Sequence, residues 1–419
     1  MYKVFKFGGA SVKDAGAVRN VASIITRFKN EKLVVVVSAM GKVTNALEEL
    51  HKARFHKVNT AEVIAQLKGY HEGIGQDLFG NKYDECMSPI FDLFEEMEEK
   101  VMMPLSGDED LEYDQIVSYG ELFSTAIVHQ YLALQGFSTG FADARQIVKT
   151  DNRHRDARVD WAKSALGAEK LKSQLEKYDQ VIIQGFIGSG NNGVTTTLGR
   201  EGSDFTAAIV AYLLDAEDVT IWKDVPGMLN ADPKVFNETV KLDKISFREA
   251  IELAYYGASV IHPKTVKPLQ NKNIPLYIKS FIEPDAEGSV IQESAEFDNL
   301  VPCFIQKSNQ VLLSITPKDF SFVVEDNLKE IFEMLSEIGI RIHMMENSAL
   351  NFSICTDRDE YKQEKLISML KNKYNIRYNE DMQLLTARHY NDDNIKMLTK
   401  DKEILLEQRN RQTVRFVVR

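Results

Sequence analysis

The stretch KFGGAS, residues 6–11, combines a lysine with two adjacent glycines at the end of a strand-like segment. Lys6 supplies a cation, and the N–H groups of Gly8 and Gly9 can approach an anion closely because glycine has no Cβ. A helix that begins near Ser11 would direct its N-terminal dipole at the same point. These features favour a site for a transferring phosphoryl group. An ordinary Gly-Gly turn beside an exposed lysine is the alternative.

A second charged stretch, LGREGSD (198–204), precedes an apolar helical segment. Arg200 can bind a carboxylate through two parallel hydrogen bonds. Ser203 and Asp204 are explained equally well by a helix N-cap. Glu121, which ends the tetrapeptide SYGE, is an acid that could hold an ammonium group, or a glutamate on a helix surface. One cation for phosphate, one for carboxylate and one acid for an amine would suit an amino-acid substrate.

The composition limits the partners. The chain has 419 residues, enough for two or three domains, and its net charge of −11 argues against nucleic acid or an anionic membrane as the main partner. The three cysteines form no C-x-x-C pair, which is typical of reduced thiols in a cytoplasmic protein and predicts no cysteine metal site. We expect neither a secretory leader nor a membrane span, because the longest aliphatic run, LVVVV, is far too short.

The first 300 residues alternate between strand-like and helix-like patterns, which predicts a mainly parallel sheet covered by helices. The predicted strands are 1–7, 33–41, 180–188, 218–222 and 274–281, and the predicted helical segments include 44–105, 204–216 and 247–258. Ligands of such sheets bind at the carboxyl ends of the strands. Four loops at these ends are rich in glycine, hydroxyl or charged residues, so we expect the chemistry there.

Several common motifs are excluded. Gly188, Gly190 and Gly193 fit G-x-G-x-x-G, but the β-branched run VTTT follows where a dinucleotide site needs a helix. The sequence contains no P-loop, H-E-x-x-H, nucleophile elbow or kinase H-R-D set. The RHRD stretch at 153–156 is interpreted as a solvated loop rather than a ligand cluster.

Six motifs together resemble the aspartate kinases of the amino-acid-kinase family, and the resemblance covers essentially the whole chain. They are KFGGAS (6–11), VSAMGKVTN (37–45), SYGE (118–121), GFIG…GVTTTLGREGSD (185–204), KDVPGMLNADP (223–233) and ELAYYGASVIHPKT (252–265). The resemblance implies transfer of the ATP γ-phosphate to the side-chain carboxylate of L-aspartate, the first step towards lysine, threonine and methionine. It also implies a three-layer α/β/α amino-acid-kinase fold with a mainly parallel sheet, followed by a ferredoxin-like ACT region.

The resemblance also implies roles for individual residues. Lys6 would contact the transferring phosphoryl group and Asp204 would organise the active site. The aspartate-binding residues would be Thr44, Glu121, Arg200 and Ser203. The ATP-binding residues would be Lys6, Gly8, Gly9, Ser38, Lys223, Asp224, Asn230 and Lys234. Mg²⁺ would be held mainly through phosphates and water, so no residue is predicted to be a metal ligand.

This sequence departs from the family pattern at several places. Ala10, Glu201, Lys223, Leu229, Lys234 and Ser259 stand where the family usually has Thr, Gly, Thr, an aromatic, Arg and Lys. Lys223 and Lys234 could restore positive charge, whereas Glu201 would repel a phosphate unless it points away. These changes concern nucleotide affinity more than reaction type. A kinase for another small carboxylate and a catalytically weak amino-acid sensor therefore stay open as alternatives.

A polar stretch at 283–302 separates the C-terminal region. Beyond it, the pattern βαββαβ is ferredoxin-like and fits the expected ACT domains. The sequence therefore predicts a catalytic domain at 1–298 and an ACT-type regulatory and dimerisation region at 304–419. That region would hold one full unit and a second that stops too early to be complete. Open strand edges would favour a homodimer or a higher homo-oligomer.

Overall fold

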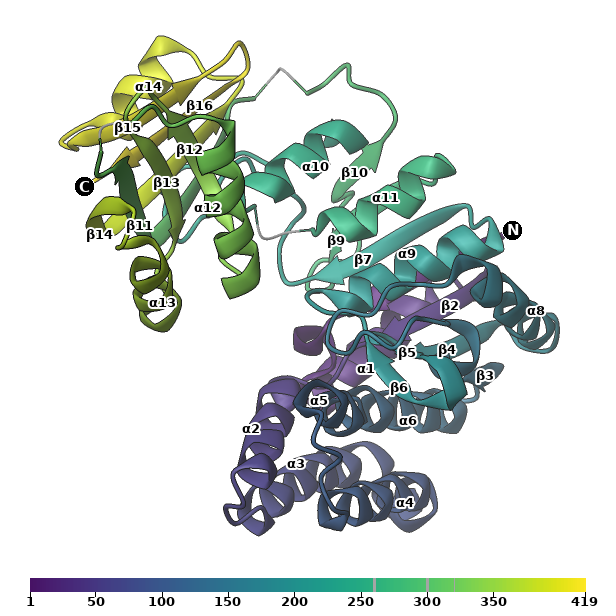
Figure 1. The fold of residues 1–419 in the computed structure, drawn as a ribbon. Coiled ribbons are helices and arrows are strands. Elements are labelled where there is room, and N and C mark those ends of the chain that lie inside the picture. The colour runs from purple at the N-terminus through teal and green to yellow at the C-terminus, as the bar shows by residue number, and fades with distance from the viewer. Residues whose placement is uncertain (259–260, 299–300, 320) are drawn as a thin grey trace. The chain divides into compact units, whose positions relative to one another are not determined.

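The protein is described by a computed structural model that covers residues 1–258, 261–298, 301–319 and 321–419 (Figure 1). The chain divides into two compact units. Unit 1 comprises Met1–Met228, Lys241–Ile251 and Ser259–Asp298, and unit 2 comprises Leu229–Val240, Glu252–Ala258 and Asn299–Arg419. Ser259, where the family has a lysine, lies outside the described residues. Among the described helices, none has the length and apolar character needed to cross a membrane.

An eight-stranded sheet forms the centre of unit 1, with the strand order β3-β4-β2-β1-β7-β9-β10-β8. The strands are β1 (Tyr2–Phe7), β2 (Lys32–Val37), β3 (Thr139–Ala142), β4 (Gln180–Gln184), β7 (Asp218–Lys223), β8 (Lys244–Ser246), β9 (Leu276–Ser280) and β10 (Ser289–Gln292). Every neighbouring pair is parallel except β9 and β10. The prediction of a mainly parallel sheet is confirmed, and the continuous apolar runs of β1 and β2 are explained by burial on both faces.

Helices form the two outer layers of unit 1. The apolar helix α9 (Gly202–Leu214) packs on β1, β2 and β7, beside α8 (Trp161–Lys177) and α11 (Pro263–Asn271). The other layer contains α6 (Tyr119–Leu134), which packs on β2, β3 and β4, and α1 (Ala15–Thr26), which contacts α6. This arrangement is the three-layer α/β/α fold that the resemblance implied (Figure 1).

The predicted helical segment 44–105 consists of three helices rather than one. They are α2 (Val43–Phe55), α3 (Ala61–Phe79) and α4 (Tyr83–Met102), and the short helix α5 (Glu109–Val117) follows. Buried Arg54 ties this group together: its Nε donates to the carbonyl of Val101, 3.0 Å away, and its guanidinium pairs with Glu112 of α5. The pairing holds α5 in place immediately before α6.

The segment that resembled a dinucleotide fingerprint is a β-hairpin. Its strands β5 (Ile187–Ser189) and β6 (Thr195–Thr197) are antiparallel, so the β-branched run forms a strand as expected. The sequence patterns did not predict several short elements: β3, β8, β10, α11 and α7 (Ala144–Ile147). The predicted helix 247–258 is α10 (Phe247–Tyr256).

Unit 2 is built on a six-stranded antiparallel sheet with the order β12-β13-β11-β14-β16-β15. Its strands are β11 (Cys303–Pro317), β12 (Ile342–Asn347), β13 (Phe352–Asp357), β14 (Tyr374–Arg388), β15 (Ile404–Arg409) and β16 (Thr413–Val418). Three helices accompany the sheet: α12 (Glu325–Ile338), α13 (Glu360–Leu370) and α14 (Asp392–Thr399).

The two 15-residue strands β11 and β14 each serve two βαβ arrangements. Residues 310–317 of β11 pair with β13 and with the first half of β14, which completes the first ferredoxin-like unit. Residues 303–307 pair with the second half of β14, beside β16. The second unit therefore takes a strand that precedes the first unit in the sequence. The sequence pattern did not predict the strand segment 303–307, because its pairing joins residues more than 75 positions apart.

Trp222 in β7 is central to the core of unit 1. The indole is 1% exposed, stacks on Phe7 with 6.1 Å between ring centroids, and meets the edge of Phe5 at 5.7 Å. We expect Trp222→Ala to lower the free energy of unfolding of this unit by about 3–5 kcal/mol, because the removed ring leaves a cavity. Urea denaturation measures the change.

Trp161→Ala is the matched control, because Trp161 lies at the start of α8 and is 38% exposed. Its loss should cost much less. Equal destabilisation by the two substitutions would contradict the central role of Trp222.

Candidate active site

A cavity of about 480 Å³ lies in unit 1 at the carboxyl ends of β1, β2 and β7. Its walls come from these strand ends, the helices α2, α5 and α6, the first turn of α9 and the connecting segments between them. The lining residues are Lys6, Gly9, Ser38, Ala39, Gly41, Thr44, Glu48, Tyr113, Glu121, Arg155, Phe186, Gly199, Arg200, Glu201, Gly202, Ser203, Asp204 and Lys223. The cavity therefore forms where the carboxyl ends of parallel strands predict a ligand site.

Asp204 lies between two lysine side chains at one end of the cavity. The Nζ of Lys6 is 2.6 Å from Asp204 Oδ1, and the Nζ of Lys223 is 3.2 Å from Oδ2. The two lysines lie side by side because β1 and β7 are parallel neighbours, in which Lys6 pairs with Ile221. Side chains two residues apart on a strand point to the same face, so Lys223 joins Lys6.

Asp204 is ionised in this arrangement. Burial of its carboxyl, which is 1% exposed, opposes the charged form, but Lys6 and Lys223 outweigh that effect and hold the pKa of Asp204 below its usual range. A helix N-cap alone does not account for this placement. Asp204 lies in the first turn of α9 and anchors both ammonium groups beside the cavity.

The glycine turn approaches the cavity as the sequence suggested, but its helix is different. A side chain at Gly9 would lie 2.9 Å from the carbonyl oxygen of Ala39, so only glycine fits there. The helix expected near Ser11 is only a 3₁₀ turn, Gly9–Val12, and α1 begins at Ala15. The helix α9 does line the cavity with its first residues, and α2 and α6 contribute Thr44 and Glu121 from their own first turns.

The residues predicted to bind aspartate, Thr44, Glu121, Arg200 and Ser203, line the same cavity. Glu121 is 3% exposed, which rules out the alternative of a surface glutamate. Its Oε1 accepts a hydrogen bond from the N–H of Ala39 at 3.2 Å, whereas Oε2 has no hydrogen-bond partner among the described residues. Burial raises the pKa of Glu121 to about 8, although Ala39 and Lys6 oppose the shift.

Glu201, where the family has glycine, lines the cavity instead of pointing away from it. Its backbone has a left-handed φ of 54°, a conformation in which glycine is less strained. Burial raises the pKa of Glu201, while the neighbouring ammonium of Lys223 works against that shift. A higher pKa reduces the repulsion that an ionised carboxylate would exert on a phosphate.

The predicted nucleotide residues are only partly gathered at this cavity. Lys6, Gly9, Ser38 and Lys223 line it. Gly8 and Asp224 belong to unit 1 but not to the lining, and Asn230 and Lys234 belong to unit 2. The Asn230 side chain accepts a hydrogen bond from Val240 at 2.7 Å and donates one to the Pro302 carbonyl at 2.9 Å. Their nucleotide role stays a prediction.

Nine lining residues were not among the predicted site residues: Ala39, Gly41, Glu48, Tyr113, Arg155, Phe186, Gly199, Glu201 and Gly202. Tyr113 donates a hydrogen bond to Glu48 at 2.7 Å, and the guanidinium of Arg155 lies 4.4 Å from the Tyr113 ring centroid. Phe186 belongs to the quoted motif GFIG, which was the available signal. The RHRD stretch gave no such signal. It is a loop, as predicted, but it is not simply solvated, since His154 and Arg155 both bond to buried Asp114.

Metal binding by protein side chains alone has little support in the described part of the chain. No group of three or more His, Cys, Asp or Glu residues is placed there to hold an ion. Asp204 is instead held by Lys6 and Lys223, and Glu48 accepts a hydrogen bond from Tyr113. The site is therefore suited to bind anions, and a divalent ion would have to enter on the phosphates of a nucleotide.

Comparison with known proteins agrees with this geometry. Residues 1–280 match the amino acid kinase family. Lysine-sensitive aspartokinase 3 of Escherichia coli is 33% identical over 364 residues, which cover 84% of this chain and 78% of that protein. The chloroplastic bifunctional aspartokinase/homoserine dehydrogenase 2 of Arabidopsis thaliana is 30% identical over 89% of this chain, which spans only 42% of that protein.

The fold agrees as well. The crystal structure of E. coli aspartokinase III in complex with aspartate and ADP superposes with a TM-score of 0.85 at 28% identity, covering 100% of this chain and 96% of that one. The agreement thus extends over both units, each with its own sheet. The chain therefore belongs to the amino acid kinase family and, within it, to the aspartokinases.

Proposed function

We propose that the cavity of unit 1 is the active site of an aspartate kinase. The chain transfers the γ-phosphate of ATP to the side-chain carboxylate of L-aspartate and releases ADP and 4-phospho-L-aspartate. The observation that carries this proposal is that one cavity is lined by two lysines held on one aspartate, together with Arg200 and Glu121. The similarity to aspartokinases along most of the chain supports the same conclusion.

The reaction requires little acid–base chemistry from the protein. The nucleophile is a carboxylate with an ordinary pKa of about 3.9, so it is already ionised at neutral pH. The attacking oxygen forms a bond to the γ-phosphorus while the bond to the ADP oxygen breaks. The protein has to bring two anions together and stabilise charge on the phosphoryl oxygens. Lys6 and Lys223 supply that charge, and Asp204 fixes their positions.

The amino-acid end of the substrate is held by opposite charges. Arg200 takes the α-carboxylate through its planar guanidinium, and ionised Glu121 takes the ammonium group. Ser203 and Thr44 line the same wall and offer hydroxyl groups. Side chains of fixed length on both sides favour a four-carbon amino acid, because a longer one would misplace its distal carboxylate from the phosphoryl group.

The remaining predicted residues are assigned to the nucleotide and its metal ion. Ser38, Gly8, Gly9, Lys223, Asp224, Asn230 and Lys234 are proposed to bind ATP. Mg²⁺ would be held by the phosphates and water, since the described carboxylates form no metal cluster. The ion would supply further charge neutralisation at the phosphates.

We also propose the domain roles. Residues 1–298 form the catalytic domain and residues 304–419 the ACT-type region, which brings two copies together as a homodimer or a higher homo-oligomer. The exposed outer strands β12 and β15 of the six-stranded sheet support pairing with a second copy. A cytoplasmic location is consistent with the reduced thiols that the cysteine spacing predicts.

The proposed reaction predicts an acyl phosphate that hydroxylamine traps as a hydroxamate. We expect ATP-dependent hydroxamate formation with L-aspartate and almost none with L-glutamate, measured by the ferric complex. Lys6→Ala should remove nearly all activity, because the phosphoryl group loses a direct cation. Equal rates with both amino acids would contradict an aspartate kinase and favour a kinase for another carboxylate, and no hydroxamate with either would favour the amino-acid sensor.

A second prediction concerns Arg200. Lysine keeps the charge but not the two parallel N–H groups, so Arg200→Lys should raise the KM for aspartate by about tenfold or more and change the KM for ATP by less than about twofold. Initial rates with each substrate varied in turn measure both constants. A loss confined to ATP would reassign Arg200 to the nucleotide.

A third prediction follows from the pKa of about 8 for Glu121. The ammonium of aspartate needs the ionised form, so kcat/KM for aspartate should rise from pH 6 towards pH 8 and level off above it. Glu121→Gln should bind aspartate more weakly and lack this rise. A wild-type profile that is flat between pH 6 and 8 would contradict the assignment.

The same residue has a separate effect on stability. Because the folded pKa of Glu121 lies above its unfolded value, the folded state binds the extra proton between the two values. The free energy of unfolding of the ligand-free enzyme should therefore fall as pH rises through this window. Glu121→Gln should lessen that fall in urea denaturation, which separates a titrating Glu121 from a change in substrate ionisation.

A further inference from the structure

Asp114 in α5 is a buried carboxylate that the proposed mechanism does not use. It is fully buried at 0% exposure and is not part of the cavity wall, although its neighbour Tyr113 is. Its Oδ1 accepts hydrogen bonds from the hydroxyl of Thr197 at 2.6 Å and from the N–H of Arg155 at 3.1 Å. Its Oδ2 accepts from the N–H of Thr197 at 3.1 Å and contacts Nδ1 of His154 at 2.8 Å.

The site of Asp114 requires a carboxylate rather than an amide. Both oxygens face donors, so an asparagine would direct its NH₂ group at donors whichever way it is turned. Burial raises the pKa of Asp114, and the hydrogen bonds from Thr197, His154 and Arg155 oppose that shift. An unsatisfied buried donor is costly, which makes this position intolerant of a neutral substitute.

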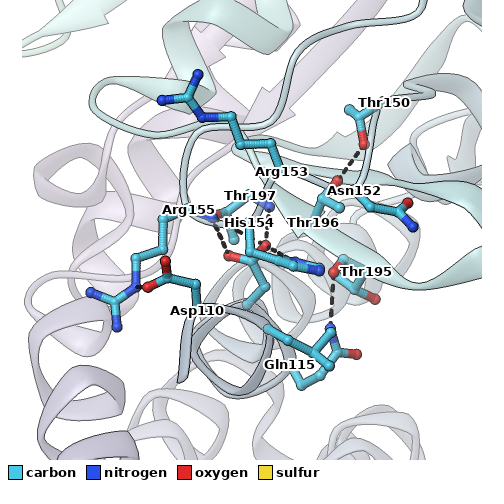
Figure 2. Close-up of polar contacts among 12 residues, drawn as sticks. Asp110, Gln115, Thr150, Asn152, Arg153, His154, Arg155, Thr195, Thr196 and Thr197 are labelled. Carbon is cyan, nitrogen blue, oxygen red and sulfur yellow. Dashed lines mark hydrogen bonds and ion pairs between the residues drawn. The ribbon is translucent and has the colours of Figure 1, made fainter. Parts of the chain in front are cut away.

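The partners of Asp114 belong to two segments that reach the cavity. His154 and Arg155 lie in the loop 150–158, and Thr197 ends β6, three residues before Arg200. Figure 2 shows His154, Arg155 and Thr197 converging on one place. The loop is joined to β6 again where the N–H of Ala157 donates to the Thr197 carbonyl at 2.9 Å.

The loop 150–158 also lies in close contact with the turn at Gly199 that leads to Arg200. A side chain at Gly199 would lie 2.7 Å from Asp156 Oδ1 and 3.1 Å from the carbonyl oxygen of Arg155, so the two segments touch through a glycine. Arg155 itself has a left-handed φ of 60°, which costs a non-glycine residue roughly 1–2 kcal/mol. The hydrogen bond from its N–H to Asp114 helps to hold that conformation.

We propose that Asp114 is a positioning residue for the aspartate end of the active site. It holds the loop 150–158 and the end of β6 together, so that Arg155 and Arg200 line the same cavity. This inference rests on the proposed aspartate kinase function. The phosphoryl end depends on other contacts, since Lys6 and Lys223 come from β1 and β7 and are anchored by Asp204. Loss of Asp114 should therefore act on aspartate and spare ATP.

The test is Asp114→Asn in the full chain. We expect the KM for aspartate to rise by about tenfold or more, with the KM for ATP changed by less than about twofold and kcat by less than about threefold. A purely structural role would lower the melting temperature and the fraction of active enzyme, but it would not raise one KM selectively. Calorimetric titration with L-aspartate checks the same loss without turnover.

Two threonines of β6 provide a second variant and a matched control. Thr197→Val removes only the hydroxyl that donates to Asp114, and we expect a smaller selective rise in the KM for aspartate, about threefold. Thr195→Val makes the same change at a buried residue of the same strand, and the bond that Thr195 accepts from Gln115 is kept because its backbone carbonyl makes it. The Thr195→Val enzyme should have wild-type constants.

Three outcomes would overturn the inference: an unchanged KM for aspartate in folded Asp114→Asn, an equal rise in both KM values, or equal effects of Thr195→Val and Thr197→Val. If Asp114→Asn does not fold, the comparison of Thr197→Val with Thr195→Val decides the question. A wild-type enzyme that forms no hydroxamate with aspartate would instead refute the proposed function. The two failures are therefore distinguishable.

Discussion

The paired charges of Lys6, Asp204 and Lys223 are the interaction on which the rest of the active site depends. A buried carboxylate is costly unless cations and hydrogen bonds satisfy it, and Asp204 has an ammonium group at each oxygen. The three side chains come from β1, α9 and β7, so this cluster fixes two strand ends and one helix N-terminus relative to one another. An incoming phosphoryl group thus meets cations that are already in place, which limits reorganisation during the reaction.

The residues proposed to bind aspartate are positioned in a different way. Glu121 is held by α6 and the N–H of Ala39, but Arg155 and Arg200 lie on connecting segments. Such segments need additional contacts to keep a fixed conformation, and Asp114 provides them from α5. The ends of the strands therefore position the lysines that contact the phosphoryl group, while buried hydrogen bonds position the residues that bind the amino-acid substrate.

Unit 2 depends on its two long central strands, β11 and β14. Because β11 and β14 both run through the middle of the six-stranded sheet, neither ferredoxin-like half has a complete set of strands without them. A register shift near Gln310 divides the long ladder into the part that serves each half. The two halves share their central strands, so unfolding of one removes hydrogen-bond partners from the other.

The sequence by itself determined the parallel sheet and the strand-end loops, because apolar periodicity is a local property, and the resemblance of its motifs to the aspartate kinases grouped Lys6, Glu121, Arg200 and Asp204. Only the tertiary structure decided that Glu121 is buried with a raised pKa, that Glu201 faces the cavity, that α9 rather than α1 presents its N-terminus, and that residues 303–307 complete the second half of unit 2. It also brought Asp114 to the RHRD loop, 40 positions away. These features depend on contacts between distant segments, and desolvation and hydrogen bonding at such contacts cannot be inferred from the pattern of either segment alone.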